Sequence, residues 1–491
     1  MRSSGSTGNP VPNGSRSSTG ANVEQSNDVT HVVIVGGGPG GYEAALVGAQ
    51  LGGRVTLIDS EGIGGASVLT DCVPSKTLIA TAEVMTEVKE SGELGIRYGP
   101  DEVQVDLGAV NKRVLALASQ QSTDIADRLR RDGVEIVVGS GRLDGPERVI
   151  AETVEGFRAF DADVVLIATG AHPRVLPDAV PDGDRILTWT QLYELPELPQ
   201  KLIVVGSGVT GAEFASAYHA LGAEVVLVSS RDRVLPGEDA DAARVLEEVL
   251  TRRGMQVMPK SRAAAVTRDG DLVTVTLTDG RTVTGSHCLL AVGSIPNTEG
   301  LGLEKAGVQT DDRGFVVVDK VSRTTARGVY AAGDCTGVLM LASVAAMQGR
   351  IAMWHSLGDA VSPLDLATVS SNVFTAPEIA TVGVSQQQVD SGDFTAVSVL
   401  LPLEGNARAK MQGLHDGFVK IFCLPMTGII VGGVVVAPRA SELIFPLTVA
   451  VAQRITVDQL AKDFTVYPSL SGSVSEAARR LHSHATMITT P

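Results

Sequence analysis

The sequence predicts an α/β protein with two Rossmann-like nucleotide-binding domains and a C-terminal α+β domain. From about residue 30, apolar β-branched runs alternate with alanine-rich helical stretches, as they do where helices cover a parallel sheet. A motif of strand, glycine turn, helix and strand occurs twice, at 31–60 and 201–236. Beyond about residue 364 the pattern changes to hairpin-like strands and a helical stretch, which indicates a separate α+β domain.

The length of the chain is consistent with this organisation. Its 491 residues, 44% of them apolar, can form about three domains with separate hydrophobic cores. Residues 1–29 are rich in Ser, Gly and Asn and are predicted to form a disordered tail. The first nucleotide-binding domain is expected at 30–172 and 293–358, the second at 173–292 and the C-terminal domain at 364–485.

Composition excludes several classes of function. The chain has 40 basic and 56 acidic residues, and its formal net charge of -16 disfavours nucleic acid as a partner. No stretch approaches the roughly 20 apolar residues that cross a bilayer, and the first thirty residues lack an apolar signal core. We therefore expect a cytoplasmic protein with no integral membrane segment. The four cysteines lie far apart and show no metal-ligand spacing, so no metal site is predicted.

The first glycine motif contains every part of a dinucleotide-binding unit. Its sequence is HVVIVGGGPGGYEAALVGAQLGGRVTLIDS, in which a strand runs into Gly36, Gly38 and Gly41 and a second strand ends at Asp59. The glycines allow a tight turn, close approach of the backbone to a pyrophosphate and close helix packing. The helix N-terminus then faces the phosphates, and Asp59 can bind a ribose diol.

The second motif predicts a second nucleotide. It reads KLIVVGSGVTGAEFASAYHALGAEVVLVSSRDRVLP and contains Gly206, Gly208 and Gly211. The position that corresponds to Asp59 is Ser229, and Arg231 and Arg233 follow it. Because an acid here would repel a 2′-phosphate, we expect the site to accept NADPH, and NADH beside it. The alternative is that both arginines are solvated surface charges.

Three further segments each contain a strand that ends in a glycine-containing turn. ADVVLIATGAHPRVLP and SHCLLAVGSIPNT are apolar strands that end in small-Gly turns, as expected where the chain crosses between nucleotide-binding domains. GVYAAGDCTGVLMLASVAAMQGR places Asp334 at a strand end, before a helix that begins near Leu341. Asp334 could hydrogen-bond the polyol chain of a cofactor, and the helix N-terminus could stabilise a negatively charged reduced ring.

The order of these motifs resembles the FAD-dependent pyridine nucleotide-disulfide oxidoreductases, such as lipoamide dehydrogenase and glutathione reductase. The resemblance extends over about residues 30–480 and includes the segment GG…C-x-P-S-K. It implies a homodimer in which NAD(P)H passes hydride to FAD, and the reduced flavin opens a redox-active disulfide. The three domains would then be an FAD-binding, an NAD(P)-binding and a dimerisation domain.

The resemblance also implies site residues. Lys76 would lie near flavin N5 and pair with Glu213, and we count Lys76, Glu213 and Cys72 as the catalytic candidates. The expected cofactor-binding residues are Gly36, Gly38, Gly41, Asp59, Ser67, Lys76, Gly141, Thr169, Gly170, Gly206, Gly208, Gly211, Arg231, Gly293, Asp334, Leu341 and Ala342.

Two departures from the family pattern bear on the electron acceptor. The family has GG-T-C-x4-C-x-P-S-K, whereas GIGGASVLTDCVPSK has Ser67 in place of the first cysteine and retains only Cys72. A hydroxyl cannot replace a sulfur in thiol exchange, so Cys72 is either a buried small hydrophobe against the flavin or a catalytic group without its partner. The family's C-terminal His-Pro-Thr-x-Ser-Glu is YPSLSG here, with Tyr467 and Gly472 in place of base and carboxylate.

These losses predict retained transfer of hydride to FAD with a new oxidant. The segments DCVPSK, VGSGVTGAEF, YAAGDCTG and VYPSLSG resemble an actinobacterial group of lipoamide dehydrogenase-like NAD(P)H quinone reductases, which implies a quinone. One alternative is a soluble pyridine nucleotide transhydrogenase. Another is a single-cysteine flavin peroxidase that uses Cys72, although Tyr42 stands where such enzymes usually carry histidine. A third is a flavin-bearing subunit of a larger complex without turnover of its own.

Overall fold

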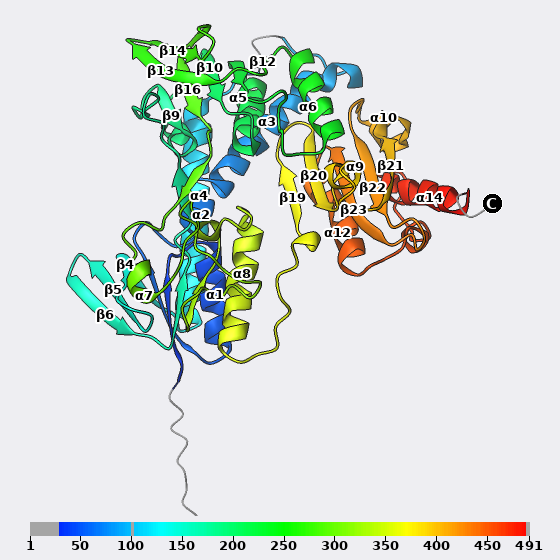
Figure 1. Cartoon of the computed structure of the whole chain (residues 1–491). Helices are drawn as coiled ribbons and strands as arrows, with labels where there is room; N and C mark the ends of the chain where they lie inside the picture. Colours follow the sequence, from blue (N-terminus) through cyan, green and yellow to red (C-terminus); the bar gives the residue numbers. More distant parts are fainter. Residues whose placement is uncertain (1–28, 100–102, 488–491) are drawn as a thin grey trace, which may run out of the picture.

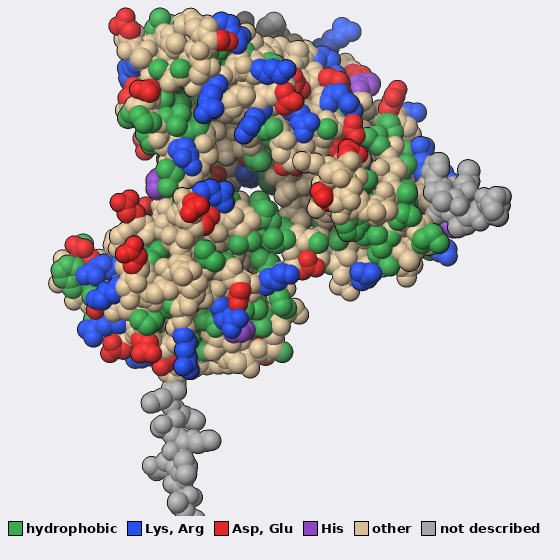
Figure 2. Space-filling model, in the orientation of Figure 1, with side chains coloured by type: hydrophobic (Ala, Val, Ile, Leu, Met, Phe, Trp, Pro, Cys, Tyr) green, Lys and Arg blue, Asp and Glu red, His purple; other side chains and the backbone are tan. Residues whose placement is uncertain are grey.

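The computed structural model describes residues 29–99 and 103–487, so the predicted tail lies almost wholly outside the described residues. The chain forms three domains, and the second is inserted between two parts of the first (Figure 1). The face seen in Figure 2 is hollowed where the first nucleotide-binding domain meets the other two.

The first nucleotide-binding domain is built on a parallel five-stranded sheet of order β18-β7-β1-β2-β3. Its strands are β1 (His31–Val35), β2 (Arg54–Asp59), β3 (Glu135–Val138), β7 (Val164–Ile167) and β18 (Val329–Ala331). Alternate residues of β1 face opposite layers. Val32 and Ile34 pack toward helices α1 (Pro39–Gln50) and α8 (Ala342–Ser356). Val33 and Val35 pack toward the antiparallel strands β4 (Ser140–Leu143), β5 (Arg148–Thr153) and β6 (Gly156–Asp161). Burial on both faces explains the continuous apolar run in β1.

The second nucleotide-binding domain repeats this layering. Its parallel sheet has the order β12-β11-β10-β16-β9, with β9 (Ile186–Thr188), β10 (Lys201–Val205), β11 (Glu224–Val228), β12 (Gln256–Met258) and β16 (His287–Leu290). Leu202 and Val204 share a core with helices α5 (Val209–Leu221) and α6 (Ala240–Arg252). Ile203 and Val205 share another with the antiparallel strands β13 (Ala263–Asp269), β14 (Leu272–Leu277) and β15 (Thr282–Gly285). Between the two sheets the chain passes through β8 (Ala171–Pro173) and β17 (Ser294–Pro296), which pair antiparallel.

The C-terminal domain is an antiparallel sheet of order β19-β20-β23-β22-β21 with helices packed on it (Figure 1). Its strands are β19 (Ser370–Val373), β20 (Glu378–Gly383), β21 (Val397–Pro402), β22 (Phe418–Cys423) and β23 (Ile430–Ala437). Its helices are α9 (Gln386–Asp390), α10 (Ala407–Met411), α11 (Ala440–Leu443), α12 (Phe445–Ala452), α13 (Val457–Leu460) and α14 (Gly472–Met487). The three sheets confirm the predicted fold class.

Helices near the N-terminus connect the domains. The short helix α2 (Gly65–Leu69) precedes α3 (Cys72–Glu90), and α4 (Leu107–Arg131) comes next. Helix α3 packs against α5, so the segment that begins at Cys72 lies beside the second nucleotide-binding domain. The remaining short helices are η1 (Ser91–Leu94), η2 (Trp189–Glu194), α7 (Leu303–Ala306), η3 (Asp334–Thr336), η4 (Leu366–Thr368) and η5 (Leu403–Gly405). Among residues 29–99 and 103–487, no helix combines the length and the apolar character needed to cross a membrane.

Candidate active site

The first glycine turn brings α1 close to the sheet by contacts that a side chain would block. Gly36 has a φ of 108°, and a Cβ atom on it would lie 2.2 Å from the carbonyl oxygen of Ala168. A Cβ atom on Gly41 would lie 1.8 Å from the carbonyl oxygen of Gly36. By contrast, the space beside Gly38 is open, and the first turn of α1 carries no acidic side chain. The N-terminus of α1 therefore fits a pyrophosphate.

Asp59 organises the same turn. Its Oδ2 accepts a hydrogen bond from the backbone N–H of Gly37 at 2.6 Å, and its Oδ1 accepts from those of Gly62 and Glu61 at 2.6 and 2.9 Å. The carboxylate thus joins the glycine turn to the loop after β2, while its contact with a ribose stays a prediction.

The second glycine turn has the same construction. Gly206 has a φ of 115°, and a Cβ atom on it would lie 2.1 Å from the carbonyl oxygen of Ala291. A Cβ atom on Gly211 would lie 1.9 Å from the carbonyl oxygen of Gly206, and the space beside Gly208 is open. The N-terminus of α5 therefore offers a second site for a pyrophosphate.

Beyond β11 the two arginines differ in their surroundings. Ser229 is fully buried, and its hydroxyl lies 2.7 Å from that of Ser207 in the glycine turn. Arg233 donates from its guanidinium to the carbonyl oxygens of Pro236 and Glu238, so it is not a free, solvated charge. Arg231 is exposed, and its guanidinium has no hydrogen bond or ion pair within the part of the chain that the structure describes.

Lys76 and Glu213 are brought together as predicted from the resemblance. The Nζ atom of Lys76, on α3, lies 2.8 Å from Oε2 of Glu213, on α5. The Glu213 side chain is 4% exposed, and its Oε1 accepts from the backbone N–H of Phe374, beyond β19. Burial alone would lower the pKa of Lys76, but the Glu213 carboxylate outweighs burial and raises it. Lys76 is therefore a permanent cation in the site.

Cys72 lies among carboxyl groups. Burial, reinforced by Asp71, raises the pKa of the Cys72 thiol to about 12, although Lys76 opposes the shift. Burial and Asp71 also raise the pKa of Asp334 to about 6. Burial also raises the pKa of Asp71. Asp71 is not among the site residues predicted from the sequence, and the only feature of the sequence that could have indicated it is its position directly before Cys72.

Ser67 lies on α2, where its hydroxyl donates to the carbonyl oxygen of Gly64. The start of this helix packs on the first glycine turn, since a Cβ atom on Gly65 would lie 2.8 Å from the Cα atom of Gly38. The four cysteines of the chain, all within the described residues, are free thiols.

The crossing between the two sheets is held by reciprocal hydrogen bonds. Thr169 donates from its hydroxyl to the carbonyl oxygen of Asn297 at 2.6 Å, and the Asn297 amide donates to the carbonyl oxygen of Thr169 at 2.8 Å. Gly170 and Gly293 have φ values of 70° and 97° at the same crossing. Gly141 lies on β4 against Val35, where β1 ends.

Asp334 comes after β18, and Leu341 directly precedes α8, which begins at Ala342. The buried Gln348, on α8, was not among the predicted residues. Its Oε1 accepts from the backbone N–H of Gly333 at 2.8 Å and so fixes the turn that presents Asp334. Because glutamine is common on helices, the sequence carries no signal for this contact.

At the far end of the chain, Tyr467 is 84% exposed, and Gly472 begins α14. The two lie in the C-terminal domain, away from Lys76 along the chain, and neither provides a base or a carboxylate. Within the described residues, no group of three or more His, Cys, Asp or Glu side chains could hold a metal ion.

Comparison with known proteins gives a consistent result. The family model described as pyridine nucleotide-disulphide oxidoreductase matches residues 30–349, and the model of the family's dimerisation domain matches residues 369–478. A Mycobacterium tuberculosis protein named NAD(P)H dehydrogenase (quinone) is 56% identical over 466 residues, which cover 93% of this chain and 94% of the relative. A dihydrolipoyl dehydrogenase of Zymomonas mobilis is 33% identical over 461 residues, covering 92% of this chain and 98% of the relative.

Similarity to solved structures is consistent with the family match. The crystal structure of LpdA from Mycobacterium tuberculosis is 56% identical, matches with a TM-score of 0.88 and covers 92% of this chain and 100% of that chain. The Escherichia coli flavoprotein disulfide reductase RclA, 24% identical with a TM-score of 0.81, covers 92% of this chain and 99% of that chain and shares the fold. The chain therefore belongs to the pyridine nucleotide-disulphide oxidoreductase family of FAD-dependent enzymes.

Proposed function

We propose that this enzyme is an NAD(P)H:quinone oxidoreductase in which electrons pass from FAD directly to a quinone, with no redox disulfide. When bound, FAD supplies the chemistry that accepts a hydride and releases two electrons. The protein binds and orients the two nucleotides through the glycine turns and places the cation of Lys76 in the site.

The observation that carries this proposal is that Cys72 has no partner sulfur. A disulfide needs two sulfurs about 2 Å apart, and Ser67 stands where the family pattern has the first of its two cysteines. The other cysteines cannot replace it, because Cys288, Cys335 and Cys423 are buried in three different hydrophobic cores. These positions support the proposal that no thiol relay runs between flavin and substrate within one chain.

The acid-base pair of the disulfide reductases is also missing, since Tyr467 and Gly472 take its place. A dithiol substrate needs this base, whereas a quinone can accept electrons from a reduced flavin without it. The name of the 56% identical mycobacterial relative supports a quinone as the oxidant. The Lys76–Glu213 pair, which the family resemblance implies lies near flavin N5, is retained.

The environment of Cys72 argues against a peroxidase. A peroxidatic cysteine must ionise, but burial and Asp71 hold the pKa of Cys72 at about 12. At neutral pH the thiolate is therefore a very small fraction of Cys72.

We further propose that Arg231 binds the 2′-phosphate of NADPH. It comes just after the position where an acid would repel that phosphate, and its guanidinium is exposed and unpaired in the described chain. Arg233 supports the loop instead.

A cytoplasmic homodimer is the assembly that we propose. Large apolar side chains are exposed on the dimerisation domain, among them Phe445, Phe464, Val466 and Tyr467. An apolar surface of this kind is characteristic of a covered interface, and a second copy of the family's dimerisation domain would cover it.

The first prediction concerns the acceptor. Purified, FAD-loaded enzyme with NADPH is expected to reduce menadione, and Cys72→Ser should retain at least about half of that rate because no thiol takes part. NADPH oxidation is measured with menadione, lipoamide, hydrogen peroxide and thio-NAD as separate acceptors. Faster turnover of lipoamide or peroxide, or loss of menadione turnover in Cys72→Ser, would contradict the proposal. Faster reduction of thio-NAD would identify a transhydrogenase.

The second prediction concerns the pH dependence of Cys72. A raised pKa keeps the thiol protonated below that value, so alkylation by iodoacetamide should rise about tenfold per pH unit between pH 7 and pH 10 without a plateau. Mass spectrometry of the Cys72 peptide, with free cysteine as the control, measures the rate. A plateau near pH 8 would show an activated thiolate.

The third prediction concerns nucleotide choice. Arg231→Ala should raise KM for NADPH by roughly tenfold or more and leave KM for NADH within about twofold, since only the 2′-phosphate loses a charge-assisted hydrogen bond. Arg327→Ala, an exposed arginine of the FAD-binding domain, serves as the control. Equal changes for both nucleotides would reject the role of Arg231.

A further inference from the structure

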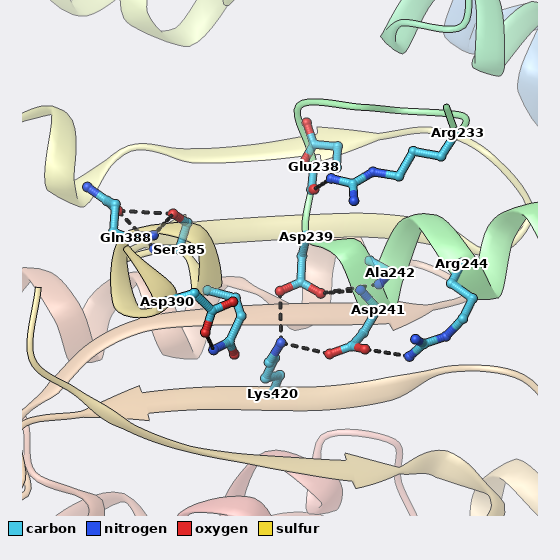
Figure 3. Close-up of polar contacts among 11 residues, drawn as sticks. Arg233, Glu238, Asp239, Asp241, Ala242, Arg244, Ser385, Gln388, Asp390 and Lys420 are labelled. Carbon is cyan, nitrogen blue, oxygen red and sulfur yellow. Dashed lines mark hydrogen bonds and ion pairs between the residues drawn. The ribbon is translucent and has the colours of Figure 1, made fainter. Parts of the chain in front are cut away.

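A buried ion pair joins the dimerisation domain to the NAD(P)-binding domain. Lys420 lies on β22, and its Nζ atom is 2.9 Å from Oδ2 of Asp239 and 2.9 Å from Oδ2 of Asp241. The side chains of Lys420 and Asp239 are 4% and 3% exposed. Figure 3 shows the lysine reaching from its strand to the start of α6. The ring of Phe422, two residues along β22, lies 5.5 Å from the same Nζ.

Asp239 uses its two carboxylate oxygens for different purposes. Oδ1 caps α6 by accepting from the backbone N–H groups of Asp241 and Ala242 at 3.0 and 3.2 Å. Oδ2 is left for Lys420. The lysine therefore fixes the N-terminus of α6 to the sheet of the other domain.

Asp239 is also the last residue of the loop 229–239, which carries Arg231. Within this loop Arg233 donates to the carbonyl oxygens of Pro236 and Glu238, as Figure 3 shows for Glu238. Leu235, with a φ of 50°, donates its N–H to the carbonyl oxygen of Ser207 in the glycine turn. At its start the loop is held by the buried Ser229, to which Arg231 donates its N–H. The loop is thus held at both ends and in its middle, while the Arg231 side chain extends freely from it.

A buried ion pair is by itself weak evidence that it stabilises the contact between two domains. Replacing a buried ion pair with apolar groups is often neutral or stabilising, because the charges must be removed from water. What such a pair gives is a fixed geometry, since its atoms must meet within hydrogen-bond distance. Here the fixed point is Asp239, at the end of the loop that presents Arg231.

We propose that Lys420 is a positioning residue for NADPH, which acts through Asp239 to hold the 229–239 loop where Arg231 receives the 2′-phosphate. This inference rests on the role proposed for Arg231 as the ligand of that phosphate. If Lys420 acts in this way, the preference for NADPH over NADH depends on a residue of the dimerisation domain.

A second ion pair between the same domains provides a matched control. Arg252, at the other end of α6, pairs through both of its terminal nitrogens with the carboxylate of Asp416, just before β22. This pair also joins α6 to the dimerisation domain, but it is exposed and lies far along the helix from the loop. Removing it tests whether any break between the domains has the same effect.

The test compares Lys420→Met, Lys420→Arg and Arg252→Met in the FAD-loaded enzyme. The affinities for 2′,5′-ADP and for ADP, which lacks the 2′-phosphate, are measured by calorimetry. Lys420→Met is expected to weaken the binding of 2′,5′-ADP by about fivefold or more and the binding of ADP by less than about twofold. In the same variant, KM for NADPH should rise while kcat stays unchanged. Lys420→Arg should restore much of the affinity, and Arg252→Met should bind as wild type.

Unchanged binding of 2′,5′-ADP in Lys420→Met, or equal weakening of both ligands, would overturn the proposal. Should Lys420→Met not fold, Asp241→Asn removes one of the two carboxylates without touching the cap at Asp239, and a smaller shift in the same direction is expected. A parallel titration of Arg231→Ala separates the two hypotheses. If Arg231→Ala binds 2′,5′-ADP normally, the proposed nucleotide site is wrong, whatever Lys420 does.

Discussion

The ion pair between Lys76 and Glu213 is the interaction on which the arrangement of the site depends. Lys76 belongs to the helix that begins at Cys72, and Glu213 belongs to α5, which follows the second glycine turn. The other oxygen of Glu213 accepts a hydrogen bond from the backbone N–H of Phe374 in the dimerisation domain. Because Glu213 is nearly buried, removing its cation would leave an uncompensated charge, which costs about 3–5 kcal/mol. One carboxylate therefore connects helices α3 and α5 with the dimerisation domain.

Near the Lys76–Glu213 ion pair, the cysteine pattern of this chain differs from that of the disulfide reductases. Ser67 stands where the family pattern has the first of its two cysteines. Here burial and Asp71 keep Cys72 protonated, and the other three cysteines are enclosed in separate cores. Both glycine turns are present while the first cysteine of the family pattern is not, which supports the proposed path of electrons directly from the flavin.

Features that obey local rules are predictable from the sequence alone. Gly36 and Gly206 take positive φ values, and Gly41 and Gly211 allow helix and turn to touch, which the spacing of the motifs predicts. The pairing of Lys76 with Glu213 was accessible only through the family resemblance, because 137 positions separate them. Contacts that depend on domain docking leave no local signal, as with Lys420 and Asp239, 181 positions apart, or with Gln348, which fixes the turn before Asp334. Arg231 and Arg233 look alike in sequence, and only the folded loop separates their roles.

We propose that one chain stores two electrons, because FAD would be its only redox centre. Anaerobic titration of the FAD-loaded enzyme with NADPH or dithionite, monitored by flavin absorbance, counts these electrons directly. The account predicts complete bleaching of the flavin after one two-electron equivalent per chain, with no earlier intermediate. Uptake of four electrons per chain, with a charge-transfer band after the first equivalent, would show a redox-active sulfur pair and contradict it.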